Sequence, residues 1–345
     1  METITSELRR YFKKTTSSGI FLTDHLAGYW SNLSKIENTR LINLLKTSSS
    51  LNLIRELYPY LEEVIYSPKR TAGLELLDIK GSESCIDYGC MWGALSIPLA
   101  KRTNSVIGVD QTLESLEFLK SRSIEEKLDN IELICADLRR LPDFNLKFDI
   151  ALVNGVLEWI PEEGIIELGS YYGNFQQKNY AENPGLQQKA FLEYVYNQLK
   201  TGGKIYLAIE NRYDWKMFFG AKDPHANIAY TTIVHRSLAN IISKWQLGRP
   251  YVNWIYSFSE IKKLLLETGF CKTELFAAFP DYRFPEKIIP FNKKYAHLIP
   301  VASKLRDSSG RIILMSVLSW LIKSFIFRNL RLISLSPSII AIAHK

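Results

Sequence analysis

The sequence predicts a doubly wound α/β fold, in which helices cover both faces of a mostly parallel sheet of seven strands. From Ser84 onward, short apolar runs alternate with segments of helical periodicity. The runs are apolar at consecutive positions, which is typical of strands buried on both faces. The chain has 345 residues, of which 46% are hydrophobic and 23% are charged. This composition fits one large α/β domain with appendages, or two small domains.

The expected elements follow in chain order. Residues 1–80 are predicted to be mostly helical, because Leu57, Leu61 and Val64 recur at helical spacing. Strands are expected at 85–86, 105–109, 131–135, 148–153, 204–209, 271–278 and 338–343. Helices are expected at 94–101, 113–121, 187–199 and 259–268. Ser259 is the expected N-cap of the last helix and Gly269 its end, and residues 200–203 are expected to form a helix stop and turn.

Residues 211–256 interrupt this alternation. They are rich in aromatic side chains, with Gly and Pro between them. A stretch of this length is too long for a plain loop, so we expect a cap beside the ligand-binding edge of the sheet. The predicted organisation is a helical segment at 1–80, an α/β core at 81–210 that continues at 257–285, the cap at 211–256, a basic helical appendage at 286–335 and a closing strand at 336–345.

Several classes of protein are disfavoured by composition. The N-terminus lacks the pattern of a secretory signal, and no run reaches the roughly 20 apolar residues of a spanning helix. The cysteines Cys85, Cys90, Cys135 and Cys271 show no CxxC spacing and no nearby histidine set, so we expect reduced, buried thiols and no metal site. A cytoplasmic location follows, with peripheral contact at the inner membrane left open.

The C-terminal appendage carries most of the positive charge. Between Arg283 and Arg331 there are ten Lys and Arg residues against Glu286 and Asp307, whereas the whole chain has a net charge of +7. Within residues 311–331, apolar side chains share one helical face and basic ones flank it. This segment is either an interfacial helix, which would suit a lipid-linked acceptor, or a helix packed on the domain.

The strongest motif is the segment Ser84–Ala94, which joins a strand to a helix through Gly89 and Gly93. Glycines at such a turn let the backbone approach a ligand closely. In an open α/β sheet, ligands bind at the carboxyl ends of the strands. Acidic or polar residues follow there on successive strands: Asp87, Asp110, Asp137 and Asn154. A carboxylate at Asp110, 23 residues after Asp87, can accept hydrogen bonds from both hydroxyls of a ribose.

These motifs, with Leu199-Lys200-Thr201-Gly202-Gly203, resemble in their order those of the class I S-adenosylmethionine-dependent methyltransferases, which have a Rossmann-like fold. The resemblance covers residues 67–278 and the closing strand. It implies that Gly89 and Gly93 flank the methionine moiety of the cofactor and that Asp110 holds its ribose. It also implies that Asp137 and Leu138 border the adenine. The expected cofactor residues are Asp87, Gly89, Cys90, Gly93, Asp110, Gln111, Asp137, Leu138 and Asn154.

One position departs from the family pattern. The family commonly has glycine where Met91 stands, and a methionine there could crowd the cofactor. A degenerate cofactor-binding domain without catalysis is therefore one alternative function.

Catalysis on a hydroxyl needs a general base near the sulfonium methyl group. The candidates at the ligand edge are Glu158, Glu210, Asp223 and His225, of which His225, Glu158 and Asp223 are the expected catalytic residues. His225 can also be a structural histidine. Asn211 and Arg212, directly after the fifth strand, are the expected acceptor-binding residues.

The acceptor is expected to be a saccharide or a related cell-envelope glycan precursor. The segments 208–212, 220–225 and 279–285 are loosely similar to a bacterial branch linked with surface-polysaccharide assembly. Adenine- and glutamine-methylating enzymes carry an Asn/Asp-Pro-Pro-aromatic motif where this chain has Asn154-Gly155-Val156-Leu157, so those acceptors are disfavoured. A methyltransferase for RNA or protein is the second enzymatic alternative.

Overall fold

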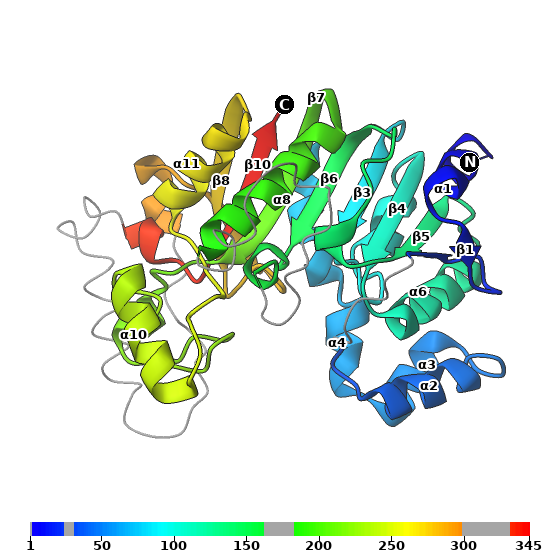
Figure 1. Cartoon of the computed structure of the whole chain (residues 1–345), viewed down its shortest axis with the longest axis horizontal. Coiled ribbons are helices and arrows are strands. Elements are labelled where there is room, and N and C mark those ends of the chain that lie inside the picture. The colour runs from blue at the N-terminus through cyan, green and yellow to red at the C-terminus, as the bar shows by residue number, and fades with distance from the viewer. Residues whose placement is uncertain (1, 24–30, 162–182, 299–331) are drawn as a thin grey trace.

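The computed structural model describes residues 2–23, 31–161, 183–298 and 332–345. They form one mixed sheet with helices on both faces (Figure 1). The seven predicted strands lie side by side in it, in the order β5-β4-β3-β6-β7-β10-β8. Their bounds are β3 (Ser84–Tyr88), β4 (Ser105–Asp110), β5 (Ile131–Cys135), β6 (Phe148–Asn154), β7 (Leu199–Glu210), β8 (Lys272–Phe279) and β10 (Ser338–His344).

All of these strands except β10 run in one direction. The pairs β3–β4, β4–β5, β3–β6 and β6–β7 are parallel, and β10 is antiparallel to both β7 and β8. The chain moves outward from β3 through β4 to β5 and then returns to β6 on the other side of β3. Such a switch in strand order opens a crevice at the carboxyl ends of the strands, and the candidate site residues lie there.

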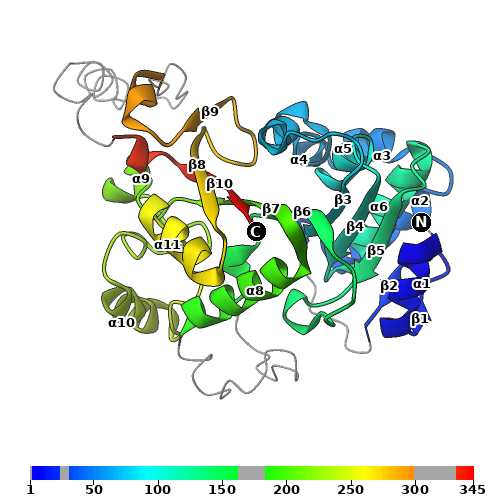
Figure 2. The ribbon, with the colours of Figure 1, turned by 90° about the horizontal axis from the view of Figure 1, so that it is seen from above.

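Alternate strand residues form two separate cores. One face is covered by α1 (Glu2–Tyr11), α8 (Pro184–Gln198) and α11 (Phe258–Thr268), which bury Ile86 and the residues of the other strands on that face (Figure 2). The other face is covered by η1 (Pro68–Leu77), α5 (Ser96–Ala100) and α6 (Leu113–Glu125), which bury Cys85 and the residues of the other strands on that face. This two-sided burial is the physical reason that the strands are apolar at consecutive positions.

Two groups of helices lie at the carboxyl edge of the parallel strands (Figure 1). The first is α2 (Lys35–Leu44), α3 (Ser50–Leu57) and α4 (Tyr60–Tyr66), which pack with Trp92 and Phe118. The second is α9 (Trp215–Phe218) and α10 (Arg236–Leu247), within the predicted cap. The short helices are η2 (Leu138–Arg140), η3 (Leu157–Trp159), η5 (Lys293–Leu298) and η6 (Leu332–Leu335).

Three short strands were not predicted. They are β1 (Lys14–Thr15), β2 (Phe21–Leu22) and β9 (Lys287–Pro290), and they extend the sheet to ten strands. Strands of two to four residues are too short to show a period of two.

Two predicted boundaries need correction. Residues 200–203 do follow the end of α8, but they form an irregularity inside β7, between the pairs Phe148–Leu199 and Ile150–Lys204. The N-cap of α11 is Ser257 rather than Ser259. Ser257 forms a capping box with Glu260, an arrangement that satisfies free N–H groups at the helix start.

The cysteines are all free thiols. Cys85, Cys90 and Cys135 are buried as expected, whereas Cys271 is exposed at the start of β8. Among the described residues, none of the helices has both the length and the hydropathy that crossing a membrane requires. The amphipathic segment 311–331 lies outside the described residues.

Candidate active site

The turn after β3 is fixed to the neighbouring strand by its backbone. The N–H groups of Gly89 and Cys90 both donate to the carbonyl oxygen of Val109 in β4, at 2.8 and 3.1 Å. Gly93 has φ +76°, and a Cβ on it would lie 2.1 Å from Cδ1 of Leu119 in α6. Glycine is therefore required at 93 both by the backbone conformation and by the packing of the turn against α6.

Met91 adopts the conformation for which glycine is usual in this position. Its φ is +44°, a left-handed value that costs free energy for a residue with a Cβ. Its N–H donates to Oδ2 of Asp110 at 2.9 Å. The backbone of the turn thus keeps a glycine-like form although the residue is a methionine.

Eight of the nine predicted cofactor residues line one cavity at the switch point. They are Asp87, Gly89, Cys90, Asp110, Gln111, Asp137, Leu138 and Asn154. Gly93 does not line it and shapes the turn instead. The side chain of Met91 also lines the cavity.

The carboxylates of the cavity have local partners. Asp110 accepts hydrogen bonds from the backbone N–H groups of Met91 and Thr112, both at 2.9 Å. Asp137 accepts from the backbone and the guanidinium of Arg139, which also lines the cavity. Asp87 accepts from the hydroxyl of Ser96 at 2.5 Å. Each carboxylate oxygen can accept more than one bond, so these partners fix the side chains and leave acceptors for a ligand.

Burial dominates the electrostatics of this cavity. It raises the pKa of Asp87 to about 7, although the hydrogen bond from Ser96 opposes the shift. It likewise raises the pKa of Asp110 to about 6, against the backbone hydrogen bonds from Thr112 and Met91. Two buried acids with raised pKa values form a site that favours a cationic or hydroxyl-bearing ligand.

Arg70 is a cavity residue that the sequence did not indicate. Its guanidinium is largely buried, and burial is the main cause of its lowered pKa. Its buried Nε has no hydrogen-bond partner among the described residues. Arg70 lies in η1, outside every motif, so no local signal marked it. A buried guanidinium facing a cavity fits an anionic group of a ligand, such as a carboxylate.

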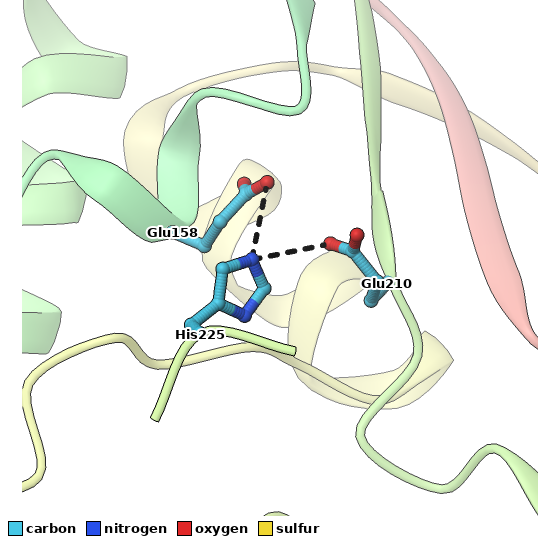
Figure 3. A group of neighbouring side chains, drawn as sticks. All are labelled: Glu158, Glu210 and His225. Carbon is cyan, nitrogen blue, oxygen red and sulfur yellow. Dashed lines mark ion pairs between the residues drawn. The ribbon is translucent and has the colours of Figure 1, made fainter. Parts of the chain in front are cut away.

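A second cluster joins residues from three separate segments (Figure 3). Nε2 of His225 lies 3.8 Å from Oε1 of Glu158 and 3.8 Å from Oε2 of Glu210. Glu158 is in η3, Glu210 ends β7 and His225 comes from the cap. Figure 3 shows the two carboxylates directed toward the same ring nitrogen. Both carboxylate oxygens of Glu158 and Oε2 of Glu210 are buried without a hydrogen-bond partner among the described residues.

Asp223 holds the imidazole of this cluster from the other side. Its Oδ1 is 3.2 Å from Nδ1 of His225 and accepts the backbone N–H of His225 at 2.8 Å. Its Oδ2 accepts the hydroxyl of Tyr251 at 2.5 Å. Burial opposes ionisation of Asp223, but the hydrogen bonds from His225 and Tyr251 outweigh it and lower the pKa. An ionised Asp223 can only accept, so Nδ1 of His225 carries a hydrogen and Nε2 faces the two glutamates.

The cluster retains protons at neutral pH. Burial, and next the charge of Glu210, raise the pKa of Glu158 to about 8. Burial lowers the pKa of His225, but its hydrogen bond to Asp223 and the charges of Glu210 and Glu158 outweigh burial and raise it to about 9. Asp223 is thus a positioning residue, and at pH 7 Glu158 and His225 each hold a proton.

The three predicted catalytic residues do not line the cavity, but one of them, His225, packs against a residue that does. Trp159 lines the cavity, and its ring centroid is 4.9 Å from that of His225. Gly155 also lines the cavity, and a Cβ on it would lie 2.3 Å from the hydroxyl oxygen of Tyr282. Burial, followed by the charges of Glu210 and Glu158, raises the pKa of Tyr282 well above its usual value. Tyr282 therefore keeps its hydroxyl proton, and this hydroxyl lies beside Gly155 in the cavity wall. Sequence reasoning missed its role, although segment 279–285 was singled out.

The expected acceptor-binding residues have other partners in the structure. The amide nitrogen of Asn211 donates to the carbonyl oxygens of Ser334 and Ser336, both at 2.7 Å. The guanidinium of Arg212 donates to the carbonyl oxygens of Thr232 and Val234 and to Oε1 of Glu260. Both side chains are buried and connect the cap to the core. We therefore assign them a structural role.

Comparison with known proteins identifies the domain. A family model described as a methyltransferase domain matches residues 79–249. A probable ribosomal RNA small subunit methyltransferase A from Methanosphaera stadtmanae is 37% identical over 81 residues, which cover 24% of this chain and 29% of that protein. The (S)-coclaurine N-methyltransferase of Thalictrum flavum subsp. glaucum is 25% identical over 139 residues, which cover 35% of this chain and 37% of that protein. The chain thus spans well under half the length of these curated relatives.

Two solved structures of methyltransferases align with the chain at TM-scores below 0.5. A phosphoethanolamine N-methyltransferase 2 of Haemonchus contortus, in complex with S-adenosylhomocysteine, superposes with a TM-score of 0.43 at 16% identity, covering 88% of this chain and 59% of that one. A possible histamine N-methyltransferase of Thermotoga maritima gives a TM-score of 0.41 at 13% identity, covering 86% of this chain and 97% of that one. The family match, together with the strand order and the cavity residues, identifies residues 79–249 as a class I S-adenosylmethionine-dependent methyltransferase domain.

Proposed function

We propose that the protein transfers a methyl group from S-adenosylmethionine to a hydroxyl group of a saccharide or a related cell-envelope glycan precursor. The observation that carries this proposal is the buried cluster of Glu158, Glu210 and His225, one side chain from the cofactor cavity. A hydroxyl acceptor must lose its proton as it is methylated, and a carboxylate of the cluster can accept that proton in its ionised form.

The cavity residues fit the parts of the cofactor. Asp110 accepts bonds from the ribose hydroxyls while its other lone pairs hold Met91 and Thr112. Asp87 pairs with the ammonium group, and its raised pKa makes this pairing dependent on pH. The orphaned Nε of Arg70 pairs with the carboxylate of the methionine moiety or with an anionic group of the acceptor.

The reaction is a displacement at the methyl carbon. S-adenosylmethionine supplies a methyl group on a sulfonium sulfur; the acceptor oxygen bonds to that carbon as the C–S bond breaks, and the sulfur keeps the electron pair. The residues of the chain align the two reactants, which supplies much of the rate enhancement in such a transfer. The proton of the acceptor hydroxyl passes to a carboxylate of the cluster, with the hydroxyl of Tyr282 between cavity and cluster as the relay.

The saccharide class is favoured by the wall of the cavity. Trp159 presents an aromatic ring there, and aromatic faces pack against the apolar faces of sugar rings. Such precursors are made in the cytoplasm or at the inner face of the membrane, so we propose a cytoplasmic protein with contact to that surface. RNA is the second candidate acceptor, because curated relatives that align with the chain include RNA methyltransferases.

A transfer assay with a radiolabelled methyl group tests the proposal. Cell-envelope glycan precursors and total RNA are offered separately, with the wild type and Asp110→Ala compared on each. Label in the glycan fraction, dependent on Asp110, is expected. Label in RNA alone would reassign the acceptor, and no binding of the cofactor by calorimetry would support the non-catalytic alternative.

A further inference from the structure

We propose that Glu158, Glu210 and His225 bind one divalent transition-metal ion, such as Mn²⁺ or Zn²⁺, beside the acceptor end of the cofactor cavity. The three donor atoms come from η3, β7 and the cap, and they all lie within 4.8 Å of one another. Binding of the ion does not depend on the proposed methyl transfer, whereas its role beside the acceptor does.

The distances suit ligands of one ion better than hydrogen bonds. Nε2 of His225 is 3.8 Å from an oxygen of each glutamate, beyond the roughly 3.2 Å limit of a hydrogen bond. Neighbouring ligands of an ion with bonds of about 2.1 Å are separated by about 3 to 3.5 Å. Each His225–glutamate distance therefore has to shorten by about 0.3 to 0.8 Å to reach that spacing.

The second observation is the burial of unpaired carboxylate oxygens. The side chain of Glu158 has no exposed surface, and both of its oxygens lack a hydrogen-bond partner among the described residues. Within the described residues, neither Glu158 nor Glu210 has a Lys or Arg in an ion pair; the sole cationic contact is His225. Burying carboxylates is costly unless they are paired or bind a metal, and a divalent ion supplies the missing charge.

The imidazole is arranged as a metal ligand. Nδ1 donates to Asp223, which Tyr251 holds in turn, so Nε2 is directed at the glutamates. Histidines that bind metals generally donate their other ring N–H to a carboxylate or a carbonyl. One imidazole with two carboxylates suits Mn²⁺, Fe²⁺ or Zn²⁺ rather than a soft, thiolate-binding ion.

An ion held by three side chains keeps positions open for water or for an acceptor oxygen. Trp159 lines the cavity and packs against His225 of the cluster, and the hydroxyl of Tyr282 lies beside Gly155 in the cavity wall. An acceptor hydroxyl bound to the ion would lose its proton to water more readily, because the positive charge stabilises the alkoxide. In this form Glu158 and Glu210 hold the ion instead of taking the proton themselves.

The test is equilibrium binding of Mn²⁺ to the full chain without an affinity tag, followed by the electron paramagnetic resonance of the free ion. Elemental analysis after dialysis against Zn²⁺ gives the stoichiometry. We expect one ion per chain, an affinity at least about 100-fold weaker in Glu210→Gln and in His225→Gln, and a loss of about 10- to 100-fold in Asp223→Asn, which removes the support of the imidazole. Glu267→Gln, an exposed residue of α11, is the matched control and should bind like the wild type.

The variants are first compared in thermal melting and in binding of S-adenosylhomocysteine, so that a folding defect is not read as loss of the metal site. No saturable binding of Mn²⁺ or Zn²⁺ at millimolar concentration would overturn the inference, as would binding that Glu210→Gln leaves unchanged. Because neither cofactor nor acceptor is needed, these outcomes are independent of whether the protein methylates a saccharide.

Discussion

The buried carboxylates of the cofactor cavity and those of the cluster beside it differ in their hydrogen-bond partners. In the cavity each carboxylate has a nearby partner: Asp110 holds two backbone N–H groups, and Asp137 holds Arg139, two residues away. In the cluster, the oxygens of Glu158 have no hydrogen-bond partner among the described residues, and the surrounding groups come from distant segments. In the cavity, the carboxylates are held in place and can accept hydrogen bonds from a ligand. In the cluster, the carboxylates are left available to bind a proton or a metal ion.

The largest effect is expected from Glu158→Gln, which removes an ionisable group from the cluster and leaves the cavity intact. Turnover should fall by about 10²- to 10⁴-fold, the usual contribution of a group that handles a proton in the transition state. The measurement is kcat with the best acceptor at saturating cofactor. Cofactor affinity and melting temperature should match those of Glu267→Gln; if kcat of Glu158→Gln also matched that control, the cluster would have no part in the reaction.

Asp110→Ala should weaken the cofactor site by about 10- to 100-fold. The substitution removes the acceptor of the ribose hydroxyls and leaves the N–H groups of Met91 and Thr112 without a partner, at a cost of about 1–3 kcal/mol. Calorimetry with S-adenosylhomocysteine gives the change in Kd. Asp129→Ala, an exposed aspartate in the loop before β5, is the control. Equal affinity of the two variants would contradict the assignment of Asp110.

A smaller effect is expected from pH. The pKa of Asp87 is about 7 in the free protein, so its carboxyl is mostly neutral at pH 6 and mostly ionised at pH 7.5. The ammonium group of the cofactor favours the ionised form, so affinity should rise by roughly five- to tenfold over this interval. The slope should be much shallower in Asp87→Asn, which cannot ionise. A wild-type affinity that is flat or falls with pH in this window would remove Asp87 from the ammonium site.

The smallest effect concerns the strained turn. Met91→Gly and Met91→Ala remove the same contacts of the methionine side chain, but at φ +44° only alanine carries the penalty of a Cβ. Urea unfolding should therefore show Met91→Gly about 1 kcal/mol more stable than Met91→Ala. Equal free energies of unfolding for Met91→Ala and Met91→Gly would contradict the left-handed conformation of residue 91.

The same contrast explains what could be predicted from the sequence. Asp110 and Asp137 each follow a buried strand directly, so their place at the sheet edge depends only on local pattern and strand direction. Arg70 lies outside every motif, and Tyr282 lies in segment 279–285, which was not expected to line the site; tertiary packing brings both there. Asn211 and Arg212 also follow a strand, but they bond to the cap and the segment before β10. A residue's position at a strand end therefore indicates that it lies near the site, but it does not indicate which role the residue has there.

The cluster of Glu158, Glu210 and His225 could be predicted from the sequence only in part. Each was a candidate as a residue of the ligand edge, but the sequence did not show that they meet at one ring nitrogen, because the spacing between them is set by the path of the cap. The expectation that the chain has no metal site came from its cysteines, and it did not consider this combination of donors.

The central claim is that the cavity, and not the cluster, binds the cofactor. It is tested most directly by titrating S-adenosylhomocysteine into the wild type, Asp110→Ala and Glu210→Gln under one set of conditions. Binding to the wild type and to Glu210→Gln with similar Kd values, and at least about tenfold weaker binding to Asp110→Ala, is the predicted result. Absence of binding to the wild type, or equal weakening by both substitutions, would contradict it.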